Sequence, residues 1–200
     1  HDPPNPDKRA GKKIKCKKKT KTKPPKDDVI ITHSQFQFRK KIAAFDFDHT
    51  LVKPKSTTTF SKNATDWRWL RECVEDVVLK YYKKGYSIVI FTNQSRDYKK
   101  EQVKTVLDTL NIPYKAYIMY NKSLKKPNPF YFNKHITNKT YDKSLSFYVG
   151  DALGRPGDWS DSDKEFAINS NLKYIEPEEI FPFPRNPSVK LKKVKVQELV

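Results

Sequence analysis

From residue 29 onwards, short apolar runs alternate with longer segments of helical periodicity, and this alternation limits the possible folds more than any other pattern in the sequence. The apolar runs predict strands at 42–47, 87–91, 114–120, 145–149 and 172–175. Helices are expected between them, at 66–84, 97–111, 128–138 and 161–171. This order predicts an α/β fold in which helices cover both faces of a Rossmann-like parallel sheet. Asp66 is the expected N-cap of the first helix, and Gly85 the residue that ends it.

Charge divides the chain into two parts. The 200 residues contain 41 Lys and Arg against 23 Asp and Glu, a net charge of +18. Residues 1–28 hold 11 of the basic residues, four Asp and five Pro, with one aliphatic side chain larger than alanine. Such a segment buries too little apolar surface to offset its ordering entropy, so we expect a disordered basic arm at 1–28 and one domain at 29–200. The basic composition of this arm favours a role as a DNA tether or a nuclear localisation signal over a role as a solubilising tail.

The excess of positive charge predicts an anionic partner, with nucleic acid ahead of an acidic membrane surface. No apolar run approaches the ~20 residues that cross a bilayer, and the N-terminus lacks the apolar segment of a secretory leader. Cys16 and Cys73 are too few for a disulfide framework or a four-ligand zinc site. We therefore expect an intracellular protein that does not bind membranes.

Polar residues stand where four of the predicted strands end. Asp46 and Asp48 close the first, Thr92 the second, Lys126 follows the third, and Asp151 the fourth. Taken singly, each has a simpler explanation as a turn residue or as one lysine among many. In a parallel sheet, however, the carboxyl ends of the strands meet at one edge, where ligands bind. Two carboxylates there suit a nucleophile with a general acid, or a hard cation such as Mg²⁺.

The ordered set AAFDFDHTL, FTNQSR, KKPNPF and YVGDALGRPGDW resembles the phosphatase domain of the polynucleotide kinase 3′-phosphatases, in the haloacid dehalogenase superfamily. The resemblance covers roughly residues 40–181 and implies a capless haloacid dehalogenase-like fold. One departure is His49, which stands where many superfamily members have glycine. No G-x-x-x-x-G-K-[ST] motif is present, so no kinase site is expected in these 200 residues.

The resemblance implies a role for the aspartates of the first motif. Asp46 would attack phosphorus and form an aspartyl-phosphate. Asp48 would protonate the departing sugar oxygen and then activate water. Mg²⁺ would bind Asp46, the main-chain carbonyl of Asp48 and Asp151.

Other residues would assist these aspartates. Thr92, Asn93 and Lys126 would hold the phosphoryl oxygens. Thr50 and Asp163 would support the metal site, although Asp158 and Asp161 leave the last assignment open.

Spacing between the motifs favours a large substrate. The segments between residues 48 and 92, and between 94 and 126, are too short for a full cap domain, so the site should be open. We expect nucleic acid to contact Lys53, Arg96 and Arg155, with Lys55 a further candidate. Trp67, Phe130 and Tyr131 are candidate stacking surfaces, and core packing is the alternative for Trp67.

These observations predict a monomeric, Mg²⁺-dependent DNA 3′-phosphatase in DNA repair. Its partners would be DNA ends, at single-strand breaks or single-stranded 3′ ends, together with repair proteins. Its compartment would be the nucleus, or wherever the DNA lies. A capless small-molecule phosphatase and a non-catalytic nucleic-acid-binding module are the alternatives.

Overall fold

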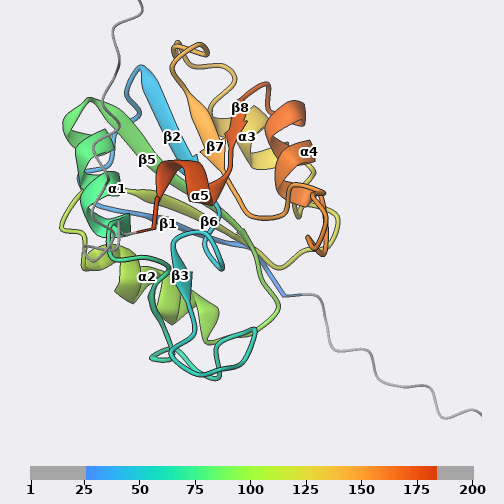
Figure 1. The fold of residues 1–200 in the computed structure, drawn as a ribbon. Coiled ribbons are helices and arrows are strands. Elements are labelled where there is room, and N and C mark those ends of the chain that lie inside the picture. The colour runs from blue at the N-terminus through green and yellow to red at the C-terminus, as the bar shows by residue number, and fades with distance from the viewer. Residues whose placement is uncertain (1–25, 184–200) are drawn as a thin grey trace, which may run out of the picture.

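The computed structural model describes residues 26–183. Its centre is a six-stranded sheet with the order β1-β6-β5-β2-β7-β8 (Figure 1). The strands are β1 (Val29–Thr32), β2 (Lys41–Phe45), β5 (Tyr86–Asn93), β6 (Lys115–Met119), β7 (Phe147–Val149) and β8 (Lys173–Ile175). The last five pair in parallel, as the alternation of strands and helices predicts.

The first strand is the exception to the predicted parallel sheet. β1 pairs antiparallel with β6, with Val29 opposite Ile118 and Thr32 opposite Lys115. This edge strand was not predicted, because four residues in an otherwise polar segment give little periodic signal. The sheet is therefore mixed, within an α/β fold whose class is confirmed.

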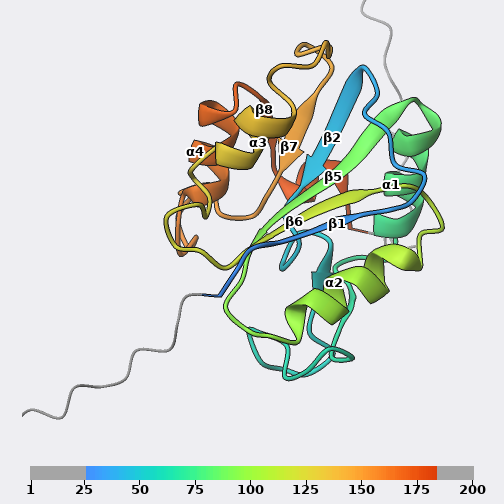
Figure 2. The same cartoon turned by 180° about the vertical axis from the view of Figure 1, so that it is seen from behind.

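Successive side chains of a strand point to opposite faces of the sheet, so the hydrophobic core consists of two clusters, one on each face. In β2, Ala43 and Phe45 point into one hydrophobic cluster, and Ile42 and Ala44 point into the other. Helices α1 (Val74–Lys83) and α2 (Lys99–Asp108) cover the first face, together with the residues around α5 (Pro177–Ile180). Helices α3 (Phe130–His135) and α4 (Ser162–Asn169) cover the second (Figures 1 and 2). Apolar side chains face helices on both sides, which explains why the strands read as continuous apolar runs.

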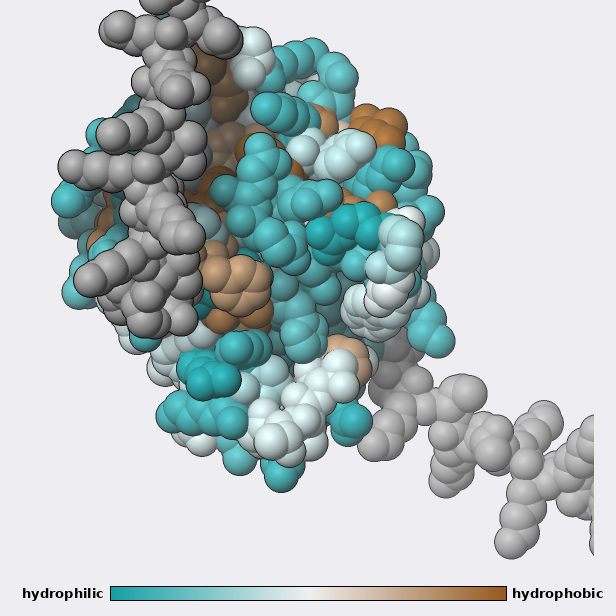
Figure 3. Space-filling view, viewed as in Figure 1, coloured by the Kyte–Doolittle hydropathy of each residue, from teal (hydrophilic) through white to brown (hydrophobic). Residues whose placement is uncertain are grey.

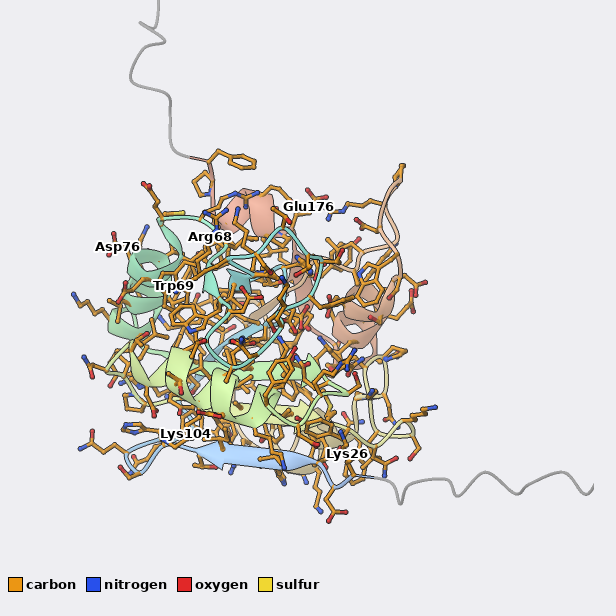
Figure 4. The ribbon with its side chains drawn as sticks, turned by 90° about the horizontal axis from the view of Figure 1, so that it is seen from below. Lys26, Arg68, Trp69, Asp76, Lys104 and Glu176 are labelled. Atoms are coloured by element: carbon orange, nitrogen blue, oxygen red, sulfur yellow. The ribbon has the colours of Figure 1, made fainter. Side chains whose placement is uncertain are left out.

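The expected helix at 66–84 is wrong in its first part. Arg68–Trp69 forms β4, which pairs with β3 (Val52–Lys53), and α1 begins only at Val74. Asp66 is not its N-cap, because its carboxylate accepts hydrogen bonds from the N–H groups of Ser56 and Lys62. These bonds lower the pKa of Asp66 to about 2 and close the loop between β3 and β4. In Figure 4, Arg68 and Trp69 lie on the same side of the molecule as Asp76 of α1.

The described chain begins inside the segment expected to be a flexible arm. Lys26 donates to the carbonyl oxygen of Ser95 at 2.7 Å and pairs with Asp97. Asp28 accepts hydrogen bonds from the N–H of Tyr120 and the hydroxyl of Tyr131. Residues 26–28 are therefore held against the domain. The rest of the predicted arm, and residues 184–200, lie outside the described residues.

The described surface is polar but only moderately basic. Residues 26–183 contain 26 Lys and Arg against 20 Asp and Glu, a net charge of +6 out of the +18 of the whole chain. Hydrophilic residues cover most of the described surface on the face shown in Figure 3. Within residues 26–183, no helix has the length and apolar character to cross a membrane.

Candidate active site

A cavity of about 820 Å³ opens at the carboxyl ends of the parallel strands. Its walls come from the ends of β2, β5 and β7, the residues after β6, the start of α2 and the loop between β3 and β4. Five residues that the sequence analysis predicted as catalytic, phosphate-binding or metal-binding line this cavity, namely Asp46, Asp48, Thr92, Lys126 and Asp151. The parallel sheet thus brings together residues that are up to 105 positions apart.

Lys126 is the buried cation of this site. Its Nζ lies 2.9 Å from Asp46 Oδ1, 2.8 Å from Asp163 Oδ1 and 2.8 Å from the hydroxyl oxygen of Tyr148. Burial pulls the pKa of Lys126 down, but the charges of Asp163 and Asp46 outweigh it and raise the pKa above its usual value. The side chain is therefore a fixed ammonium group. Its three N–H donors are used by Asp46, Asp163 and Tyr148, so it would act on a phosphoryl group mainly through its charge.

Three carboxylates cluster at this site, and two of them, Asp46 and Asp163, pair with Lys126. Asp46, Asp151 and Asp163 each offer an oxygen within 4.8 Å of the others. Burial raises the pKa of Asp46 well above its usual value, and the charge of Asp163 raises it further. Burial also raises the pKa of Asp151. One lysine does not neutralise three such groups, and oxygen donors at this spacing fit a hard divalent cation such as Mg²⁺.

Metal binding should appear as a gain in thermal stability. A cation that binds only the folded protein adds about 2.7 kcal/mol at 100 times its dissociation constant. We expect Mg²⁺ to raise Tm relative to EDTA, and Asp151→Asn to abolish most of this rise. Asp76→Asn is the control, because Asp76 is exposed on α1 (Figure 4). An undiminished rise in Asp151→Asn would contradict this site.

Asp163 is fixed by more donors than the other two carboxylates. Besides Lys126, the hydroxyl of Tyr148 donates to its Oδ1 at 2.6 Å, and the N–H of Ala152 donates to its Oδ2 at 3.0 Å. Its pairing with Lys126 and Ala152 fits the supporting role expected of it. Asp158 instead pairs with Arg155, and Asp161 is exposed at the start of α4.

Gly150 is needed because Asp163 lies against it. A Cβ atom at residue 150 would lie 2.4 Å from Asp163 Cγ. Gly150→Ala should therefore displace Asp163 and lower both turnover and the free energy of unfolding, the latter by about 1–3 kcal/mol. Gly157→Ala is the control, because that Cβ meets nothing within 4 Å although φ is +87°. It should lose stability through backbone strain alone and keep its turnover, as melting curves and initial rates would show.

Asp48 lies apart from the carboxylate cluster. Its Oδ1 accepts a hydrogen bond from Lys99 Nζ at 2.5 Å, and its Oδ2 accepts one from Gln94 Nε2 at 2.7 Å. Its side chain is therefore not among the metal-binding carboxylates, and a metal contact would have to use its main chain. Asp48 and Lys126 both line the cavity, and they do not bond to each other, so Asp48 is available as a proton donor there.

The three polar residues Thr92, Asn93 and Thr50 have different surroundings. Thr92 lines the cavity, and its Oγ1 accepts a hydrogen bond from Gln94 at 2.8 Å. Asn93 bonds both to the N–H and to the carbonyl oxygen of Lys126. This amide therefore positions the Lys126 main chain, while Asn93 also lines the cavity, and its role in phosphate binding stays a prediction. Thr50 is fully buried, and its hydroxyl lies 3.4 Å from Asp151 Oδ1, as a supporting residue should.

Of the residues expected to contact nucleic acid, the structure places only Arg96 in the cavity. Lys53 lies in β3, outside the cavity lining. The guanidinium group of Arg155 donates to Asp158, Glu178 and the carbonyl oxygen of Asp151. Arg155 therefore secures the loop after β7, because its donors are already used by protein acceptors.

The aromatic residues that line the cavity are not the ones that the sequence predicted as stacking surfaces. Trp67 packs edge-on against Trp69 in the hydrophobic core, which was the alternative expected for it. Phe130 and Tyr131 lie on α3, away from the cavity lining. Instead Phe60 and Trp159, which are 51% and 74% exposed, line the cavity with their rings 5.9 Å apart. Both lie in loops, where periodicity gives no signal.

His49 has the backbone conformation that glycine adopts most readily. Its φ is +56°, in the left-handed region, which costs a non-glycine residue about 1–2 kcal/mol. The backbone therefore makes this turn after β2 even though residue 49 is histidine and not glycine. The ring of His49 lies 6.1 Å from that of Phe60, at the cavity wall.

Comparison with known proteins agrees with this geometry. Residues 41–181 match the family described as polynucleotide kinase 3 phosphatase. This chain belongs to that family. The bifunctional polynucleotide phosphatase/kinase of Schizosaccharomyces pombe is 35% identical over 163 residues, which are 76% of this chain and 40% of that protein. The polynucleotide 3′-phosphatase ZDP of Arabidopsis thaliana is 31% identical over 169 residues, which are 71% of this chain and 24% of that protein. The chain thus spans less than half the length of each of these two relatives.

A solved structure supports the fold independently. The D,D-heptose 1,7-bisphosphate phosphatase of B. bronchiseptica, complexed with magnesium and phosphate, aligns with a TM-score of 0.53. It shares 15% sequence identity and covers 67% of this chain and 78% of that one. At this identity the likeness concerns the fold alone.

The sequence predicted that Asp46, Asp48, Asp151 and Lys126 would lie together, and the structure places all four in one cavity. The sequence did not indicate Tyr148, which bonds to Lys126, or Lys99, which bonds to Asp48.

Proposed function

We propose that this chain is a Mg²⁺-dependent polynucleotide 3′-phosphatase that acts on DNA ends. The observation that carries the proposal is Asp46, buried beside Asp151 and bonded to Lys126 at the floor of an open cavity. A carboxylate in that position can attack a phosphorus atom whose oxygens Lys126 and Thr92 hold. The family to which the chain belongs, and the relatives named for this activity, support the same reaction.

Asp46 performs the first step of this reaction. Its carboxylate oxygen forms a bond to phosphorus while the bond from phosphorus to the sugar oxygen breaks. The electron pair stays on the sugar oxygen, which takes a proton from Asp48. The products are a free 3′-hydroxyl and an aspartyl-phosphate at Asp46. Asp46 and Asp151 would hold Mg²⁺, which when bound neutralises the negative charge of the carboxylates and the phosphoryl group.

Asp48 reverses its role in the second step. A water molecule attacks the phosphorus of the aspartyl-phosphate and gives its proton to the Asp48 carboxylate. The bond to Asp46 breaks, and inorganic phosphate leaves. Asp48 is protonated again, so one residue serves as acid and then as base. Positioned proton transfer of this kind contributes about 10²–10⁴-fold to a rate.

The shape of the site favours a DNA end over a small metabolite. Between β2 and β5 lie only the β3–β4 hairpin, its loop and α1, so no separate cap domain covers the described cavity. Phe60 and Trp159 offer exposed rings at the wall of the same cavity, where a nucleobase can stack. Lys62, Arg96 and Lys125 add positive charge to the cavity wall.

A comparison of substrates tests this function. The full chain is offered a 3′-phosphorylated oligonucleotide, a sugar phosphate and a phosphopeptide, each with Mg²⁺ and with EDTA. We expect phosphate release from the oligonucleotide alone, and only with Mg²⁺. Preferential turnover of the sugar phosphate would favour the small-molecule alternative. Oligonucleotide binding without any turnover would favour the non-catalytic module.

The cellular setting follows from this function as a prediction. A 3′-phosphatase would restore ligatable 3′-hydroxyl groups at strand breaks, which places it with repair proteins in the compartment that holds the DNA. Nuclear localisation and a monomeric state are part of the proposal.

Most of the positive charge lies in the two terminal segments. Residues 1–25 contain ten basic and two acidic residues, and residues 184–200 contain five basic and one acidic residue. These segments would therefore supply most of the electrostatic attraction for a polyanion.

A further inference from the structure

Lys99 is an unusual residue for the start of a helix. It is the first residue of α2 and is only 2% exposed. A positive charge at a helix N-terminus is unfavourable, because the free N–H groups there are themselves partially positive. Burying an ammonium group is a further large cost unless the group is paired. Val103 and Val106 continue the same buried face, so helix packing by itself would favour an apolar residue at position 99.

The partner of Lys99 is Asp48, which compensates this cost when its carboxyl group is ionised, as it is once its proton has passed to the leaving oxygen. Lys99 Nζ lies 2.5 Å from Asp48 Oδ1 and 2.8 Å from Gln102 Oε1. Gln94 Nε2 holds the other oxygen of Asp48 at 2.7 Å. The Asp48 side chain is 24% exposed and borders the cavity, so its orientation towards substrate depends on these two donors.

We propose that Lys99 is a positioning residue for Asp48 in the reaction proposed above, on which this inference rests. When the proton moves from Asp48 to the sugar oxygen, a carboxylate forms 2.5 Å from the ammonium group. Lys99 stabilises that charge as it develops, and such an interaction lowers the barrier because it strengthens in the transition state. It also fixes the carboxylate rotamer that points the proton at the leaving oxygen. The benefit is therefore specific to departure of the leaving group.

A pair of oligonucleotides that differ in one atom measures this benefit. One carries a normal 3′-phosphate, and in the other a bridging sulfur replaces the 3′-oxygen. A thiolate leaves without protonation, so its release does not need Asp48 as an acid. In single-turnover experiments with Mg²⁺, we expect Lys99→Met to slow the oxygen substrate by about 10²-fold, within the range of general acid catalysis. The sulfur substrate should slow by less than about 3-fold, with KM unchanged for both.

Two matched variants and one inhibitor complete the design. Lys100→Met removes an exposed lysine from the next position of α2 and should leave both rates unchanged. Lys99→Arg keeps the charge and should recover part of the lost rate on the oxygen substrate. Inhibition by inorganic phosphate should be the same in wild type and in Lys99→Met, because Lys99 acts through Asp48 and does not contact the phosphoryl group.

Each contrary result has a defined meaning. Equal loss on the oxygen and sulfur substrates overturns the inference, because a merely structural lysine would produce it. Weaker inhibition by phosphate also overturns it, in favour of a phosphate-binding lysine. If Lys99→Met melts below the assay temperature, Lys99→Gln is compared on the same two substrates by the same criteria. An inactive wild type overturns the proposed function itself, whereas an active wild type with an unresponsive Lys99→Met overturns only this inference.

Discussion

Asp46→Asn is expected to abolish phosphate release from a 3′-phosphorylated oligonucleotide while the protein remains folded. The amide cannot form the acyl phosphate, so single-turnover rates should fall by more than about 10³-fold, equivalent to about 4 kcal/mol of activation free energy. Binding of the oligonucleotide, measured by fluorescence anisotropy, should change little, because Lys126, Thr92 and the basic cavity wall are retained.

The stability of the same variant provides a second check. The pKa of Asp46 is raised in the folded protein, so its ionised form disfavours folding at any pH above the pKa of an unfolded aspartate. The neutral amide removes this penalty. In EDTA, Asp46→Asn should therefore melt no lower than wild type, and Asp76→Asn should match wild type in both assays. Substantial turnover by Asp46→Asn would refute Asp46 as the nucleophile.

Lys126→Met should have the largest effect on stability. The substitution leaves Asp46 and Asp163 buried without their shared cation, and it removes a partner of the Tyr148 hydroxyl. Breaking a buried ion pair on one side costs about 3–5 kcal/mol, because the remaining charge stays desolvated. Denaturant unfolding in EDTA measures this loss. Mg²⁺ should recover part of it, since a bound cation would again neutralise Asp46.

The same substitution should also reduce turnover by about 10²–10³-fold, because the developing phosphoryl charge loses its fixed ammonium partner. Lys104→Met is the matched control. Lys104 is labelled in Figure 4. It pairs with Asp108 at 2.6 Å, but both side chains are exposed, and such pairs contribute about 0–1 kcal/mol. A loss in Lys126→Met no larger than that in Lys104→Met would contradict the central role given to this lysine.

The α/β alternation, the parallel strands and the edge of the sheet that carries the candidate active site could all be predicted from the amino-acid sequence. Short apolar runs separated by helical periods report burial on both faces of a sheet, and polar residues directly after β2, β5 and β7 report its carboxyl edge. Asp46, Asp48 and Asp151 could be placed for that reason. The resemblance of four motifs to one family added their roles and the link with Lys126.

The side chains that hold these residues in place became apparent from the folded structure. Lys99 is one of 34 lysines, and nothing local distinguishes it from its exposed neighbour Lys100 until α2 turns it towards Asp48. The sequence predicted Arg155 as a nucleic-acid contact. In the structure its guanidinium group instead donates hydrogen bonds to Asp158 and Glu178. Local sequence specifies periodicity and turns. Contacts between segments dozens of residues apart depend on how the whole sheet and its helices pack, and they fix the partner of each charge.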